Sequence, residues 1–308
     1  MTTDTDIRTD APTSAYVAVV LGAASMSASS VLISLAGVDS ATAAFYRCFL
    51  AALVLSPLAV AEVRRHGRLP AGLTGAALVA GVFLGVDFLM WNVSIGDIGA
   101  GISTVVVNLQ VVLFPVLVGL VSRTRISRRF LFALPVLTAG VALAGGALGG
   151  GSGGLGADPV RGTVLCVLAA VAYTGYLFLN RRSGERSPAH LVTPVFLSTA
   201  AAAATAGGAG VATGGIPVDL PAITWLWLGL LAVFGQALSW VLVARGLPRI
   251  EPAWASTLLL LQPVGAVVLA AVVLGQVPTA PQLTGCVLVL LTIWLLAAGP
   301  RFGRGRRG

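Results

Sequence analysis

Stretches of about 20 consecutive apolar residues recur along the whole chain, and they constrain the fold more than any other feature. A helix of that length crosses the hydrocarbon core of a bilayer, which is about 30 Å thick. With 57% hydrophobic and 10% charged residues, the 308-residue chain has too few polar side chains to cover a soluble domain. The alternation of about ten residues that marks transmembrane strands is not found. We therefore expect an all-α integral membrane protein.

The apolar stretches predict ten transmembrane helices. Their expected bounds are residues 16–36, 42–61, 72–95, 100–121, 130–149, 162–180, 190–212, 222–244, 252–275 and 281–299. Residues 1–15 are polar and are expected to form a disordered cytoplasmic tail, and residues 300–308 a basic cytoplasmic tail. The Gly-rich segment 150–161 is expected to be an external linker between two five-helix repeats, residues 16–149 and 162–299.

The arginines between the apolar stretches give the expected orientation. All 19 basic residues are arginines. If the amino terminus is cytoplasmic, only Arg161 lies in an outer loop, together with Asp39, Asp97, Asp158 and Asp219, and only Arg47 lies within a span. The cytoplasmic group comprises Arg8, Arg64, Arg65, Arg68, Arg123, Arg125, Arg128, Arg129, Arg181, Arg182, Arg186, Arg245, Arg249, Arg301, Arg304, Arg306 and Arg307. This bias follows the positive-inside rule and predicts a multi-pass protein of the cytoplasmic membrane with both termini cytoplasmic.

A weak internal repeat links the two halves. Ala100-Gly-Ile-Ser-Thr recurs as Ala253-Trp-Ala-Ser-Thr, and Gln110 is followed in the second half by Gln262-Pro263. Since five is odd, the second half enters the membrane with the opposite orientation. An inverted repeat of this kind is typical of secondary transporters, in which the substrate site lies near the bilayer midplane between the repeats.

Polar side chains inside the apolar stretches are the first candidates for a solute pathway, because an ionisable group at membrane depth is kept where it faces a bundle interior or a wet cavity. Arg47 is expected about 7–8 Å below the outer end of its helix and Asp87 about 12 Å below. We hypothesise that they face each other, with Asp87 as a proton-sensitive group and Arg47 as its counter-ion or a carboxylate binder. The alternatives are a static buried pair, or an Arg47 that snorkels to the interface.

Other side chains of these spans complete the candidate pathway. Amides can bond a polar solute or join helices, and aromatic rings can stack on a solute or pack in the core. The candidates of these two kinds are Asn92, Asn108, Gln110, Gln236, Gln262, Tyr173, Tyr176 and Trp240. Pro115 and Pro263 remove backbone donors within related spans and are candidate hinges, although membrane helices also tolerate such prolines without function. Gly81 and Gly85, and the serines of the first helix, are expected to allow close helix packing.

Several short strings together resemble the drug/metabolite transporter superfamily, and within it the EamA-type transporters. They are Ala43-Ala44-Phe45-Tyr46-Arg47, Ala100-Gly-Ile-Ser-Thr, and Leu274-Gly-Gln-Val-Pro-Thr followed by Gln282-Leu-Thr-Gly. The resemblance covers residues 16–299. Departures from the family pattern are Leu21-Gly22 for Trp-Gly, Ser29 for a lysine, and Arg123 and Gln276 for acidic residues. The resemblance implies movement of a small metabolite, amino acid or drug-like compound across the cytoplasmic membrane, usually outward.

Enzyme chemistry has little support in the sequence. His66 and His190 fall in or beside loops, the three cysteines are dispersed, and neither metal spacing nor a phosphate-binding loop with a lysine is found. The arginine clusters are explained by topology, so no nucleic-acid partner is expected. We predict a cofactor-free secondary exporter working by alternating access, with proton coupling through Asp87 as an option, acting as a monomer or homodimer. The alternatives are a facilitator or importer, a lipid-head-group flippase, and, from another class, a membrane enzyme or a non-transporting sensor.

Overall fold

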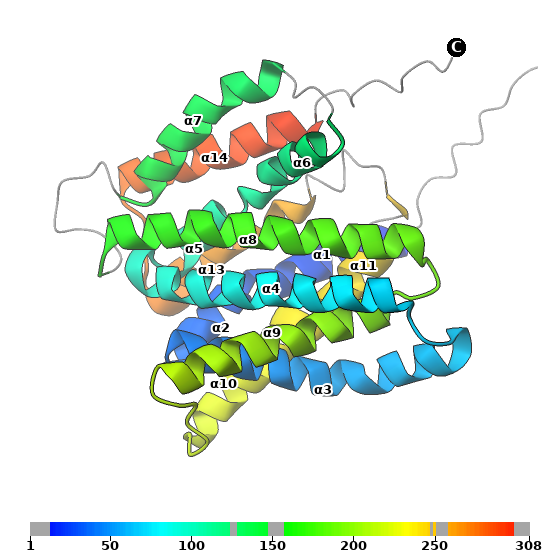
Figure 1. Ribbon diagram of the computed structural model, residues 1–308. Helices are drawn as coiled ribbons and strands as arrows, with labels where there is room; N and C mark the ends of the chain where they lie inside the picture. The colour runs from blue at the N-terminus through cyan, green and yellow to red at the C-terminus, as the bar shows by residue number, and fades with distance from the viewer. Residues whose placement is uncertain (1–12, 124–127, 147–156, 247–248, 251–257, 299–308) are drawn as a thin grey trace, which may run out of the picture.

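The computed structural model describes residues 13–123, 128–146, 157–246, 249–250 and 258–298, and its regular elements there are helices (Figure 1). Their bounds are α1 Thr13–Ser27, α2 Ser29–Ala36, α3 Ser40–His66, α4 Ala71–Ile98, α5 Ala100–Val107, α6 Gln110–Val121, α7 Arg128–Ala144, α8 Pro159–Arg186, α9 Val192–Ala212, α10 Ala222–Ala232, the π-helix η1 Val233–Leu238, α11 Ser239–Gly246, α13 Leu261–Leu274 and α14 Ala280–Ala298.

Seven helical stretches are long and apolar enough to cross a membrane. They are Thr13–Ala36, Ser40–His66, Ala71–Ile98, Ala100–Val121, Pro159–Ser183, Val192–Ala212 and Ala222–Val243. The fifth, ninth and tenth expected spans correspond to shorter apolar helices, Phe132–Ala144, Leu261–Leu274 and Ala280–Leu296. The protein is thus an all-helical, multi-pass membrane protein, and a full count of ten crossings stays a prediction. Most of both expected tails, most of the linker and residues 252–257 of the ninth span lie outside the described residues.

Helices from the two halves of the chain pack directly on each other. α4 packs on α8 and α9, and α3 packs on α9 (Figure 1). Four further pairs also join the two halves of the chain: α1 packs on α11, α2 on α10, α7 on α14 and α5 on α13. Gly81 and Gly85 face α9, where a Cβ on Gly81 would come within 2.3 Å of the Ser198 carbonyl oxygen. The expected close packing through these glycines is confirmed.

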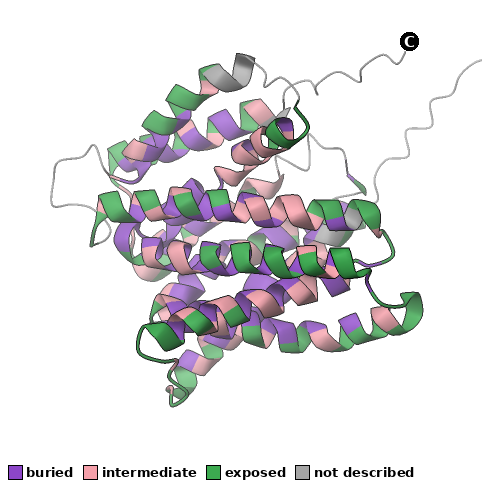
Figure 2. Cartoon of the chain, viewed as in Figure 1, coloured by how far each residue is buried: buried purple, intermediate pink, exposed green. Residues whose placement is uncertain are grey.

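The outward faces of the bundle are apolar. Figure 2 shows buried residues on the inward faces of the helices and exposed residues on the outward ones. The exposed large side chains include Leu53 and Val54 of α3 and Val79 and Val82 of α4, all more than 40% exposed. Apolar area on this scale is costly in water and costs nothing in hydrocarbon, so the bilayer is the solvent for these faces.

Four helices are irregular at similar depth in the bundle. The first span breaks at Ala28 between α1 and α2, and the fourth at Asn108–Leu109 between α5 and α6. α13 begins after a turn at Leu260, and η1 interrupts the eighth span. Irregular backbone is tolerated at membrane depth only where it is buried in protein or lines a wet cavity. These interruptions converge on the cavity described below.

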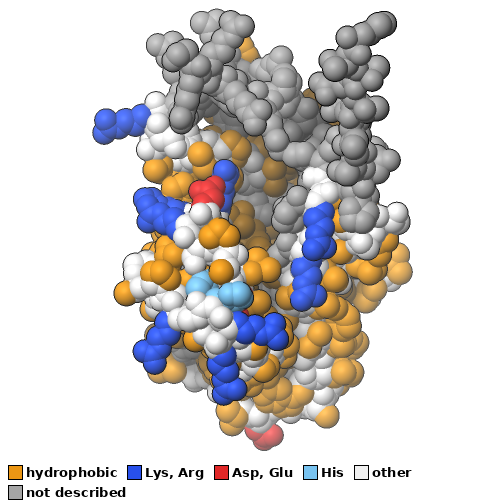
Figure 3. Space-filling model, turned by 90° about the vertical axis from the view of Figure 1, so that its right-hand side faces the viewer, with side chains coloured by type: hydrophobic (Ala, Val, Ile, Leu, Met, Phe, Trp, Pro, Cys, Tyr) orange, Lys and Arg blue, Asp and Glu red, His pale blue; other side chains and the backbone are white. Residues whose placement is uncertain are grey.

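The bundle has one basic and one acidic end. α3, α8 and α11 finish at the basic end, where Arg64, Arg65, Arg181, Arg182 and Arg245 lie. Figure 3 looks onto this end and shows arginine side chains around the two histidines. At the acidic end Asp39 and Asp158 cap the amino termini of α3 and α8. The described helix ends therefore carry the charge asymmetry that the sequence predicts.

Candidate functional site

A cavity of about 40 Å³, called the central cavity below, lies where the interrupted helices meet. Both halves of the chain contribute to its wall, through Met26, Ser29, Arg47, Asp87, Phe88, Trp91, Val107, Gln110, Tyr173, Gly235, Trp240 and Gln262. A volume of about 10–15 Å³ is enough for one water molecule, so this central cavity has room for a few waters and not for an organic solute. Six of the ten predicted pathway residues line it: Arg47, Asp87, Gln110, Tyr173, Trp240 and Gln262.

Arg47 is 5% exposed and points into the bundle rather than toward the interface. Its Nε donates to Gln236 Oε1 over 3.1 Å, and its Nη2 donates to the Gly235 carbonyl oxygen over 2.9 Å. Both acceptors belong to η1, whose π-helical turn changes the usual backbone bonding pattern. The guanidinium also lies 3.9 Å from the centre of the Phe88 ring. Nη1 is buried and has no hydrogen-bond partner among the described residues.

Asp87 lies on the same cavity without a direct ion pair to Arg47. The residue is 3% exposed, and its Oδ1 has no hydrogen-bond partner within the described part of the chain. Within the part of the chain that the structure describes, the ion pairs closer than 4.0 Å are Arg161–Asp97 and Arg181–Glu185. A buried acid and a buried base that share a cavity without contacting each other leave both groups available to a third one.

The structure separates the predicted amides into two groups. Gln110 and Gln262 line the cavity, and Gln110 Oε1 has no hydrogen-bond partner in the ranges that the structure describes. Asn92 instead donates to the Ser40 carbonyl oxygen over 3.1 Å, and Asn108 donates to the Thr104 carbonyl oxygen over 2.7 Å. Asn92 and Asn108 are not in the cavity wall. The Asn92 amide joins α4 to α3, as in the alternative of helix joining, whereas the Asn108 amide bonds within its own helix, α5.

Three aromatic residues form a cluster on the side of the cavity that faces the basic end. The Tyr173 and Tyr176 rings are stacked with centroids 5.5 Å apart, and Trp240 contacts both edge-on at 6.3 and 5.7 Å. Tyr173 and Trp240 line the cavity, whereas Tyr176 is fully buried behind them. The cluster joins α8 to α11, so it lies between elements that a pathway would have to separate.

The two prolines differ in position. Pro115 lies inside α6 on an exposed face, and the interruption of this span falls earlier, at Asn108–Leu109. Pro263 lies in the first turn of α13, next to the turn at Leu260. A proline in the first turn removes an N–H that has no partner within the helix anyway, so Pro263 fits the start of a helix.

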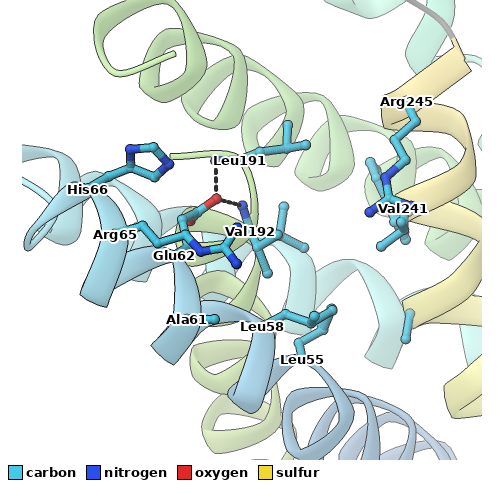
Figure 4. Close-up of a pocket in the computed structure, with 13 residues that line it drawn as sticks. Leu55, Leu58, Ala61, Glu62, Arg65, His66, Leu191, Val192, Val241 and Arg245 are labelled. Carbon is cyan, nitrogen blue, oxygen red and sulfur yellow. Dashed lines mark hydrogen bonds between the residues drawn. The ribbon is translucent and has the colours of Figure 1, made fainter. Parts of the chain in front are cut away.

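A second, larger cavity opens at the basic end between α3, α9 and the η1–α11 segment (Figure 4). We call it the vestibule. Its volume is about 340 Å³, and it is lined by Leu55, Leu58, Ala61, Glu62, Arg65, His66, Leu191, Val192, Val195, Ala237, Trp240, Val241 and Arg245. Trp240 is the residue common to both linings. Its indole therefore separates the vestibule from the central cavity.

Glu62 joins the two helices that form one wall of the vestibule. Its carboxylate accepts hydrogen bonds from the backbone N–H groups of Leu191 and Val192 over 2.7 and 2.9 Å (Figure 4). It also accepts from the Thr193 N–H over 2.6 Å and from the Thr193 hydroxyl. A side chain of α3 thus caps the amino terminus of α9, whose dipole favours a negative charge there. The sequence offered a weak signal, a lone acidic residue before a basic helix end, and our interpretation of the sequence missed it.

Polar contacts also close the acidic end. Arg161 donates from Nη2 to Asp97 Oδ1 over 2.6 Å and from Nε to Oδ2 over 2.8 Å, which links α8 to the end of α4. The Asp97 side chain is 2% exposed. Gln276 accepts from the Ala100 N–H over 2.8 Å and caps α5. Expected simply as outer-loop charges, Asp97 and Arg161 are in fact partners.

Metal and thiol chemistry are not indicated by the described residues. No group of three or more His, Cys, Asp or Glu side chains in the described ranges is placed to hold a metal ion. Cys48, Cys166 and Cys286 are buried and free, as their spacing predicts.

An apolar helix bundle with a polar cavity between its two halves and a vestibule at one end is the arrangement expected of a polytopic membrane transport protein. The model of the EamA-like transporter family matches residues 13–146 and 160–298. The chain belongs to this family, which is part of the drug/metabolite transporter superfamily, and the resemblance read from the sequence is confirmed. Members of the family are transporters and not enzymes.

Two further comparisons concern individual proteins. No curated protein matches this chain. A solved structure described only as "Crystal structure of protein" is 16% identical, covers 94% of this chain and 96% of its own chain, and superposes with a TM-score of 0.56. At this identity the likeness shows a shared fold.

Proposed function

We propose that this protein is a secondary active transporter that exports a small organic solute across the cytoplasmic membrane by alternating access. The observation that carries the proposal is the central cavity, where a buried arginine and a buried carboxylate each keep an unpartnered atom. Such groups are expensive inside a membrane and mark substrate or ion pathways. Their position between the two repeats is where transporters of this build bind solute.

The orientation follows from the charge asymmetry. The basic end is cytoplasmic by the positive-inside rule, so the vestibule opens to the cytoplasm. Reciprocal packing supports an inverted relation between the repeats: α4 packs on α8, and its counterpart segment α10–η1–α11 packs on α1 and α2. A vestibule on the cytoplasmic side of the central cavity gives a solute a way in from the cytoplasm, as the proposed export requires.

The alternation needs two closures that open in turn. The Arg161–Asp97 pair and the Gln276 cap close the acidic end, and the cluster around Trp240 closes the path to the vestibule. The present arrangement corresponds to a cytoplasm-facing state with a contracted site. Trp240 must move for an organic solute to reach the central cavity, because that cavity holds only a few waters.

Arg47 and Asp87 have different roles in this scheme. Arg47 Nη1 donates to an anionic or polar group of the solute, while Gln236 and Gly235 hold the guanidinium in place. Asp87 takes up a proton when the site faces outside and releases it when the site faces the cytoplasm, so that proton entry drives solute exit. Asp87 needs no cofactor for this role, and its carboxylate is free to exchange a proton because it has no ion-pair partner within the described residues.

The proposal is tested by comparing small molecules inside and outside cells that express the wild type, Asp87→Asn, or no protein. Asp219→Asn is the matched control, because Asp219 is exposed in a loop at the acidic end. We expect one or more compounds to accumulate outside with the wild type and the control, and to fall to the empty-cell level with Asp87→Asn at equal abundance. Equal export by Asp87→Asn would refute the role of Asp87. Accumulation inside would make the protein an importer.

A further inference from the structure

We infer that the vestibule is a recognition site for amphipathic monoanions, molecules with an apolar body and one carboxylate, and that these are the solutes passed on to Arg47. The inference rests on the proposed transport function and names the substrate class of that pathway. Three features of the vestibule and its neighbour carry it: the wall chemistry, the balance of charge, and the cation that lies beyond Trp240.

The wall of the vestibule is mostly apolar. Leu55 and Leu58 come from α3, Val195 from α9, and Ala237 and Val241 from the η1–α11 segment. At about 340 Å³ the vestibule falls in the usual range for small-molecule sites, and the central cavity does not. First contact with an organic solute therefore takes place here, and the wall selects a body that gains by leaving water.

The charge at the mouth of the vestibule is positive and unbalanced. Arg65 reaches it from α3 and Arg245 from α11, and within the described residues neither forms an ion pair. Glu62 is the acidic residue of this lining, and its carboxylate is already bonded to the start of α9. Two guanidinium groups from different walls, with the nearby carboxylate occupied, favour a solute that carries a carboxylate.

A second cation, Arg47, lies deeper in the bundle and can bind the same carboxylate. Arg47 lies on the other side of Trp240, and its unpartnered Nη1 is the free donor of a guanidinium that is otherwise held by η1. A carboxylate that leaves Arg65 and Arg245 therefore finds a new partner after the indole moves. Asp87 in the same cavity limits the negative charge that the site accepts, which favours one carboxylate over two.

The test uses the full chain in nanodiscs of neutral phosphatidylcholine with Val241→Cys as a reporter. The three native cysteines are buried, so a small maleimide reads the vestibule through the new thiol. Three probes share one ring and differ in charge: phenylacetate, phenethylammonium and benzyl alcohol. We expect phenylacetate to slow labelling in a saturable way, and the other two to have little effect. Val195→Cys on the facing wall is a second reporter should the first variant fold poorly.

Arginine variants then test which side chains bind the carboxylate of phenylacetate. Arg65→Gln and Arg245→Gln are each expected to raise the half-protecting concentration of phenylacetate up to about fivefold, because partly exposed charge pairs contribute this little. Arg64→Gln is the matched control, since Arg64 is the exposed neighbour of Arg65 and does not line the vestibule. It is expected to leave protection unchanged.

The outcomes separate this inference from the proposed function. Equal protection by benzyl alcohol, or equal effects of Arg64→Gln and Arg65→Gln, would overturn the inference. Protection by phosphatidylglycerol without solute would identify the occupant as lipid and overturn it too. Absence of protection together with intact export refutes the inference alone. Retained protection in Arg47→Gln, with export lost, supports both; retained protection with export intact refutes the role of Arg47 in transport.

Discussion

Replacing Glu62 is expected to loosen the contact between α3 and α9. The carboxylate accepts hydrogen bonds from three backbone N–H groups and one hydroxyl at the start of α9. A capping side chain contributes about 0.5–2 kcal/mol, and bonds to a charged group contribute toward the upper end of such ranges. Because Glu62 is only half-buried, water replaces part of these bonds in the variant. We expect Glu62→Ala to lower the free energy of unfolding by about 2 kcal/mol and Glu62→Gln by about 1 kcal/mol.

Thermal unfolding of purified protein in detergent measures the effect. With an unfolding entropy of about 2.1 cal/mol/K per residue, about 1 kcal/mol corresponds to about 1.5 °C for this 308-residue chain, so Glu62→Ala should lower the unfolding midpoint by about 3 °C. Glu185→Ala is the matched control, because Glu185 forms an exposed ion pair with Arg181 four residues before it. Such pairs contribute about 0.3–0.5 kcal/mol, and the expected shift is correspondingly small. Equal midpoints for Glu62→Ala and Glu185→Ala would refute the assignment of Glu62 as the cap of α9.

Three further predictions concern helix packing and the two closures. Gly81→Ala should lower the yield of folded protein because its Cβ would meet the Ser198 carbonyl oxygen at 2.3 Å. Gly75→Ala in the same helix is the control, because its Cβ would meet nothing within 4 Å. Size-exclusion chromatography of the two variants measures the difference. Trp240→Ala should join the vestibule to the central cavity and give solute leak without a proton gradient, measured in proteoliposomes. Arg161→Gln should lower the unfolding midpoint because the Asp97 carboxylate, 2% exposed, loses its partner, while water at the 58% exposed Arg161 position replaces part of the pair. A double-mutant cycle with Asp97→Asn should recover most of the loss.

Arg47 and Asp87 show how far sequence reasoning reached into the site. Both are charged residues inside apolar spans, and that alone predicted that they face the interior of the bundle. The structure places both on one cavity, together with Gln110, Tyr173, Trp240 and Gln262. Asn92 and Asn108 are also amides inside apolar spans and were candidates for the same pathway, yet they bond to the backbone of α3 and α5. Residue type and depth determine what it costs to bury a polar side chain, but they do not identify the neighbour whose hydrogen bond offsets that cost.

The sequence by itself determined the solvent of this protein, the approximate bounds of its helices and the asymmetry of its loops, because hydropathy and charge act locally along the chain. Tertiary structure decided what depends on contacts between distant segments. The hydrogen-bond partners of Glu62 lie on α9 and that of Arg161 lies on α4. Those of Arg47 lie on η1, a π-helix that the periodicity of the sequence does not predict. The separation of vestibule and cavity by Trp240 belongs to the same group, since a cavity exists only where packed helices fail to fill space, and that is a property of the assembled bundle.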